Sequence, residues 1–97
     1  MSYVNICGIR YEIKHIEPNS REDTFMGRTD PQKAIITINK TMSKNIQEQV
    51  LIHEWLHAVL GNYCLEETNN EIMVQTLASE LYRNGFKIKE TEIEFKK

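Results

Sequence analysis

Hydrophobic and polar residues alternate with a period of two in the first part of the chain. Residues 3–16 alternate around Gly8, which predicts two strands, or one strand that follows a turn. A second alternating stretch, residues 34–39, is rich in β-branched side chains and follows a turn signal at residues 30–33. The polar segment between them, residues 17–28, is predicted to be a loop with at most one short helical turn.

A helical period replaces this alternation after residue 43. Five residues are separated by intervals of four, three, four and three positions, which predicts that they form one stripe of a helix that faces the core: Ile46, Val50, His53, His57 and Leu60. Ser43 is one candidate for the N-cap, and Asn45 is the other because it would form a capping box with Glu48. Gly61-Asn62 is a natural end for this helix.

A second helix is predicted over residues 71–83, between the capping residues Asn69-Asn70 and the stop signal Asn84-Gly85. Glu71 lies at its start, on the edge of the face that carries its apolar residues. Residues 86–97 alternate again and predict a last strand with a bulge. Together these elements predict an α+β fold, in which a short antiparallel or mixed sheet packs on both helices.

Length and charge narrow the classes of protein that fit this pattern. With 97 residues, 40% of them apolar and 27% charged, the chain is expected to form one domain over residues 1–97. The formal net charge is -2 and the longest basic run at the end is Lys96-Lys97, so no nucleic-acid partner is expected. Apolar runs are far shorter than the roughly 18 to 20 residues that span a bilayer, so no membrane association is expected.

The cysteines and the start of the chain predict the compartment. Cys7 and Cys64 are the two cysteines, and the first residues lack the basic and then apolar layout of a signal peptide. We therefore expect two reduced thiols in a cytoplasmic protein, with Cys64 as a small buried apolar residue. The oligomeric state is not predicted by any feature of the sequence.

The segment His53-Glu54-Trp55-Leu56-His57 is the strongest chemical signal in the chain. Positions four apart lie on one face of a helix, so both imidazoles can reach a single metal ion while Glu54 projects beside them. A zinc ion held by two His keeps room for a water molecule, whose pKa the metal lowers, and a neighbouring carboxylate can take the proton of that water. Trp55 and Leu56 are expected to be ordinary core residues.

Zinc at such a site needs a third protein ligand. Glu71 is the preferred candidate because it begins a helix that must pack antiparallel to the first one after a short loop. The competing candidates are Glu66, Glu67 and Cys64 in the connection. His15 could approach only from the first strand region.

The residues that follow His57 limit the families of metallopeptidase that the chain can resemble. The longer metzincin pattern requires Gly and His at positions where this chain has Leu60 and Tyr63, so that class is excluded. The chain resembles the short gluzincin-like metallopeptidases, specifically the ImmA/IrrE-like and related phage or prophage H-E-x-x-H proteins. The resemblance rests on a small leading strand region, on residues 27–30 before the strand at 33–39, and on residues 49–58, 71–78 and 81–84. It implies a zincin-like domain, a zinc ion, and a Glu ligand from the downstream helix that matches Glu71.

The primary hypothesis is a zinc-dependent peptide hydrolase. His53, His57 and Glu71 would bind Zn2+, and Glu54 would act as general base on a peptide or protein substrate. An oxyanion donor is usual in such sites, and four residues are candidates for it: His15, Tyr63, Tyr82 and Arg83. If residues 34–39 form the edge of the sheet beside the metal, an extended substrate could pair with them.

Two other classes of function are also consistent with the sequence. One is a non-catalytic, zinc-stabilised protein-binding module, in which the metal would supply folding energy to a small core. The other is an adaptor or structural phage protein that binds no metal. The metal content of the purified protein separates the metal-free protein from both the hydrolase and the zinc-stabilised module.

Overall fold

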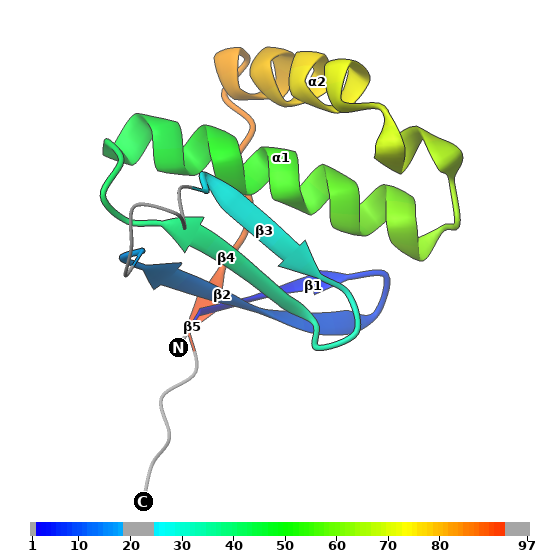
Figure 1. Cartoon of the computed structure of the whole chain (residues 1–97), viewed down its shortest axis with the longest axis horizontal. Helices are drawn as coiled ribbons and strands as arrows, with labels where there is room; N and C mark the ends of the chain where they lie inside the picture. Colours follow the sequence, from blue (N-terminus) through cyan, green and yellow to red (C-terminus); the bar gives the residue numbers. More distant parts are fainter. Residues whose placement is uncertain (1, 19–24, 93–97) are drawn as a thin grey trace, which may run out of the picture.

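The computed structural model describes residues 2–18 and 25–92 of the chain (Figure 1). It has an α+β fold in which one helix covers one face of a mixed sheet and a second helix packs on the outer side of the first. The elements in chain order are β1 (Ser2–Ile6), β2 (Ile9–Ile16), β3 (Gly27–Asp30), β4 (Ile35–Asn39), α1 (Lys44–Asn62), a short 3-10 helix (Glu66–Asn69), α2 (Glu71–Arg83) and β5 (Thr91–Glu92). The predicted α+β class, the mixed sheet and both predicted helices are confirmed, but the sheet packs on α1 alone and not on both helices as predicted.

The sheet has the strand order β3-β4-β2-β1-β5. β1 and β2 form a hairpin, so of the two arrangements predicted around Gly8 the one with two strands is correct; Cys7 and Gly8 lie in its turn at φ angles of 53° and 80°. β2 and β4 are parallel, whereas the other pairs are antiparallel, so the sheet is mixed. Its order leaves β3 and β5 as the two edge strands.

β3 is the element that the sequence analysis missed. Residues 27 and 28 were predicted to lie in a loop, but Gly27–Asp30 pairs antiparallel with Ile35–Asn39. The four-residue strand contains no apolar side chain, so no hydrophobic alternation reveals it. β4 consequently lies inside the sheet, between β3 and β2, and the suggestion that residues 34–39 form the edge is wrong.

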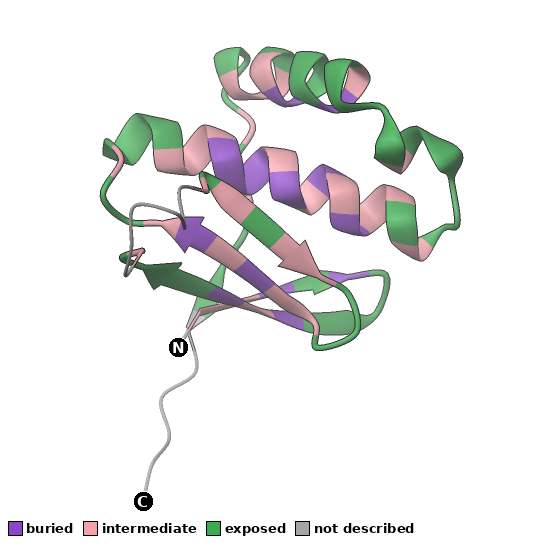
Figure 2. Ribbon diagram, viewed as in Figure 1, coloured by how far each residue is buried: buried purple, intermediate pink, exposed green. Residues whose placement is uncertain are grey.

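α1 lies between the sheet and α2 and is therefore buried on two sides (Figure 2). Val50, Leu51 and Ala58 pack on the sheet, while Ile52 and Leu56 pack on α2 with Val74 and Ala78. The predicted stripe of 46, 50, 53, 57 and 60 runs along the seam between these two faces. It faces the core only in part: Val50 is buried, but Ile46 is 44% exposed and both His are only partly buried.

The ends of the helices follow their local capping signals. Ser43 caps α1, because its hydroxyl accepts a hydrogen bond from the Ile46 N–H at 3.4 Å, so the alternative capping box at Asn45 does not form. Asn70 caps α2 by accepting a hydrogen bond from the Met73 N–H at 3.0 Å. This cap fixes where α2 begins, and hence where Glu71 lies.

The segment after α2 returns along the helices to the sheet. Residues 86–90 form no strand. The described part of the predicted C-terminal strand is β5, Thr91–Glu92, which pairs with β1; residues 93–97 lie outside the described part. Phe86 packs against Trp55 with ring centroids 5.4 Å apart, which supports the core role expected of Trp55. Within the described residues, no helix has the length and apolarity needed to cross a membrane.

Candidate metal centre

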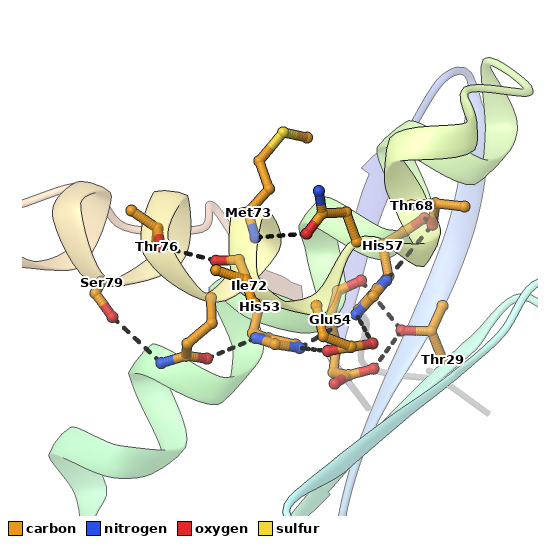
Figure 3. A network of polar contacts seen from close by, with 12 residues as sticks. Thr29, His53, Glu54, His57, Thr68, Ile72, Met73, Thr76 and Ser79 are labelled. Carbon is orange, nitrogen blue, oxygen red and sulfur yellow. Dashed lines mark hydrogen bonds and ion pairs between the residues drawn. The ribbon is translucent and has the colours of Figure 1, made fainter.

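Three side chains from two helices meet at one point beside the sheet (Figure 3). The Nε2 atoms of His53 and His57 are 3.2 Å apart, and the two carboxylate oxygens of Glu71 lie 3.2 Å and 3.1 Å from them. Two ligand atoms about 2.0 to 2.1 Å from a tetrahedral zinc ion lie about 3.3 Å from each other. The three side chains are thus spaced as ligands of one ion would be.

Each imidazole has a second partner on its other nitrogen. His53 Nδ1 lies 2.8 Å from Gln75 Oε1, and His57 Nδ1 lies 3.5 Å from Thr68 Oγ1. The Thr68 hydroxyl donates to the His57 carbonyl oxygen at 3.1 Å, so its lone pairs are available to the ring. Protons on both Nδ1 atoms leave lone pairs on both Nε2 atoms, which is the form of His that binds metal.

The Gln75 side chain is itself oriented by hydrogen bonds. Its Nε2 donates to Ser79 Oγ at 3.2 Å, and Gln49 Nε2 donates to the same hydroxyl at 2.9 Å. With its amide nitrogen held on Ser79, Gln75 presents its oxygen to His53. This chain of contacts joins α1 to α2 and holds the His53 ring, whose Nε2 lies 3.2 Å from Glu71.

The chemistry of the donors fits a divalent transition metal. Two imidazoles and one carboxylate are the three-ligand set of open zinc sites, and the same donors also accept cobalt, manganese or nickel. Glu71 has a side chain that is 68% exposed, so the site is reachable from solvent. His53, His57 and Glu71 therefore form a group that is able to hold a metal ion with one side open.

Glu54 is the buried carboxylate beside this group. It is 9% exposed, and its Oε1 accepts a hydrogen bond from the Thr29 hydroxyl at 2.8 Å. The Thr29 hydroxyl also lies 3.1 Å from the Glu54 carbonyl oxygen, so β3 is held against α1 at this point. Because the bond to Oε1 comes from the strand side, it restrains the carboxylate at the seam where the His residues lie (Figure 3).

Gly27 allows β3 to approach Glu54 this closely. A Cβ atom at Gly27 would lie 2.6 Å from Val50 Cγ1 and 3.0 Å from Glu54 Cγ. Both distances are shorter than ordinary van der Waals contacts, so any other residue would push the strand away from the helix. The glycine thus brings the edge of the sheet into the site.

Two cavities flank the metal group, one on each side. The first, of about 570 Å³, is bordered by Met26, Gly27 and Ile46, and the second, of about 450 Å³, by Thr29, Asn62 and Asn69. Glu54, His57 and Glu71 line both. The group therefore sits at the junction of a groove that extends in two directions.

The structure also separates Glu71 from the other candidate ligands. Glu66, Glu67 and Cys64 are exposed, and none of them joins the group that the described residues form. Cys64 was predicted to be buried but is exposed, because α1 ends at Asn62 and Cys64 lies in the exposed connection that follows it. Its thiol and that of Cys7 are both free.

The four predicted oxyanion donors lie elsewhere. Neither cavity is lined by His15, Tyr63, Tyr82 or Arg83. His15 Nδ1 lies 3.1 Å from Gln47 Oε1, and the Gln47 amide donates to the carbonyl oxygens of Lys40 and Met42. His15 therefore belongs to a structural contact at the start of α1.

Three contributors to the site were missed in the sequence: Thr29, Thr68 and Gln75. Gln75 had a usable signal, because it lies four residues after Glu71 and so shares its helix face. Thr29 and Thr68 contact residues 25 and 11 positions away, so no local pattern identifies them.

Comparison with protein-family models, curated proteins and solved structures finds no match for this chain.

Proposed function

We propose that this protein is a zinc-dependent peptide hydrolase of zincin-like architecture. The observation that carries the proposal is the convergence of His53, His57 and Glu71 with a restrained carboxylate, Glu54, in an open groove. A closed structural site would surround its metal with four protein ligands, whereas three ligands leave a position for water or substrate. The mixed sheet beside the motif helix and the Glu ligand from the next helix support the zincin-like arrangement.

Metal binding, proton transfer and positioning would be carried out by different residues of the site. His53, His57 and Glu71 would hold Zn2+, which when bound would acidify a water molecule and polarise the scissile carbonyl. Glu54 would accept a proton as the water oxygen adds to the carbonyl carbon, and would return it to the amine as the C–N bond breaks. Thr29 would position the Glu54 carboxylate for both transfers through its hydrogen bond.

The edge strand β3 supplies a surface for an extended substrate. The Asn39 N–H donates to the Met26 carbonyl oxygen at 3.0 Å, so these two residues form a hydrogen-bonded pair. Hydrogen-bonded and non-hydrogen-bonded pairs alternate in an antiparallel ladder, which turns the backbone N–H and C=O groups of Gly27 and Thr29 away from β4. A peptide that pairs with these groups would pass directly beside Glu54.

The test of the proposal combines metal content with cleavage. Protein purified without chelator is analysed for metal, then loaded with zinc and incubated with a library of peptides from a digested proteome, and the new termini are identified by mass spectrometry. We expect one zinc per chain in the wild type and in Glu54→Gln, and cleavage by the wild type alone. Equal cleavage by Glu54→Gln would disprove the role of Glu54, and absence of any stoichiometric metal would disprove the metal site.

The same experiment separates the alternative of a non-catalytic, zinc-stabilised binding module. That alternative is favoured by the position of the metal group, which joins α1 to α2 in a small protein. If the alternative holds, the wild type and Glu54→Gln both bind zinc, neither of them cleaves any peptide, and removal of zinc unfolds the chain.

A further inference from the structure

The cavity on the Gly27 side of the metal group has an apolar wall. Met26, immediately before β3, and Ile46, in α1, are 58% and 44% exposed and border this cavity together with the buried Val50. Isolated exposed apolar side chains are common on protein surfaces, but two that border one cavity beside a polar cluster indicate a binding surface for an apolar group.

The geometry of β3 directs a substrate side chain towards this wall. In paired strands, side chains of residues directly opposite each other point to the same face of the sheet. The Cβ direction of Gly27 points to Val50 and Glu54. A substrate residue that pairs with Gly27 lies beyond the edge of β3, and its side chain would therefore project on the side of α1, towards the cavity that Gly27 and Val50 line.

The charges around the cavity exclude acidic side chains. Of the described residues that line it, Glu54 and Glu71 carry carboxylates, and none is Lys or Arg. The Zn2+ that Glu71 would hold offsets the charge of that carboxylate, but an acidic substrate side chain would still be desolvated beside the apolar wall and the Glu54 carboxylate with no Lys or Arg to pair with, which is unfavourable. A basic side chain would have to place its charge against the wall formed by Met26, Ile46 and Val50.

The cavity on the other side of the metal group has a different character. Its border includes the polar side chains of Thr29, Asn62, Thr68 and Asn69. No Leu, Ile, Val, Met or Phe side chain lines this second cavity, so it has no counterpart of the wall formed by Met26, Ile46 and Val50. The large apolar side chains that border the metal group therefore lie on the Gly27 side.

We propose that the cavity bordered by Met26, Ile46 and Val50 is a specificity subsite for a large apolar side chain of the substrate residue that pairs with Gly27. The substrates would then be extended polypeptide segments that carry Leu, Ile, Met or Phe next to the cleaved bond. This inference rests on the proposed function, because it assigns a role to the groove of the same site.

The test uses four fluorescent ten-residue peptides that are identical and polar except at one central position, which is Leu, Ala, Asp or Lys. Binding is measured by fluorescence polarisation with zinc-loaded Glu54→Gln protein, and cleavage with zinc-loaded wild type. We expect the Leu peptide to bind on the order of tenfold more tightly than the Ala peptide, and more tightly than the charged ones. We also expect the wild type to cut it at one bond beside the Leu.

Replacement of Ile46 tests the wall directly. Ile46→Lys should lose the preference for Leu over Ala and gain affinity for the Asp peptide, because it brings a cation to the cavity. Ile9→Lys is the matched control: Ile9 is 43% exposed, as Ile46 is 44%, but it lines neither cavity. Its peptide preference should equal that of the wild type.

The outcomes distinguish the subsite from the hydrolase itself. Cleavage that is independent of the central residue, or binding that is equal or undetectable for all four peptides, overturns the subsite. Selective binding of the Leu peptide without cleavage by the wild type supports the subsite and overturns the hydrolase. An Ile46→Lys protein that retains the Leu preference also overturns the subsite.

Discussion

Replacement of Gly27 by Ala should destabilise the protein and impair Glu54 together. The added Cβ would lie 2.6 Å from Val50 Cγ1, 3.0 Å from Glu54 Cγ and 3.3 Å from the Thr37 carbonyl oxygen. Val50 cannot rotate away easily, because a β-branched side chain in a helix has one strongly preferred rotamer and this one is buried. The contact is therefore relieved by a shift of β3 or of the Glu54 side chain.

The size of the effect follows from the cost of overpacking. Extra methyl groups in a packed interior cost about 1 to 3 kcal/mol. For a domain of this length, each kcal/mol lowers the melting temperature by about 4 to 8 °C, so a decrease of about 5 to 20 °C is expected. Movement of β3 or Glu54 also weakens the 2.8 Å hydrogen bond from Thr29, so cleavage should fall at least tenfold, on the order of the loss of one such bond.

Gly61→Ala is the matched control. Gly61 lies within α1, and a Cβ there would have its nearest neighbour, Thr68 Oγ1, at 3.8 Å, which is an ordinary contact. Because Ala is favoured over Gly in a helix by about 0.8 to 1 kcal/mol, this variant should melt at the same temperature as the wild type or several degrees higher.

The assay is thermal unfolding followed by circular dichroism in the presence of EDTA, so that metal binding does not contribute, with cleavage measured separately after zinc loading. The reasoning is refuted if Gly27→Ala is as stable and as active as the wild type. It is also refuted if both glycine variants lose the same stability, because the effect would then not depend on the close approach of β3 to α1.

Three further predictions concern the metal group and Glu54. Gln75→Leu should weaken zinc binding about 10- to 100-fold, measured by competition with a chelating dye, because His53 loses its orienting partner; an unchanged affinity would contradict that role. Thr29→Val should lower kcat about tenfold with little change in KM, and Thr29→Ser should retain most activity; a purely structural role would lower the melting temperature in both variants equally. Zinc at a thousandfold excess over its Kd should raise the stability of the wild type by about 4 kcal/mol, and a Glu71→Gln protein that gains as much in calorimetry would exclude Glu71 as a ligand.

The sequence alone determined the parts of the site that depend on local geometry. A helix with a clear period and a serine cap places His53 and His57 on one face whatever surrounds them. Asn70 likewise sets the start of α2, and with it the position of Glu71 at the first turn. These features are encoded within a few residues, so periodicity and capping rules were sufficient to predict them.

Only the tertiary structure decided how these side chains face solvent and substrate. The His stripe lies at a seam because the sheet covers one side of α1 and α2 covers another, and no property of the helix itself distinguishes a seam from a core. β3 becomes the edge strand because Gly27–Asp30 pairs with a strand that follows it, although its own side chains are polar or absent. The hydrogen bond from Thr29 to Glu54 joins residues 25 positions apart. Such contacts arise from packing between elements, and the energies that select them are not present in any short stretch of the sequence.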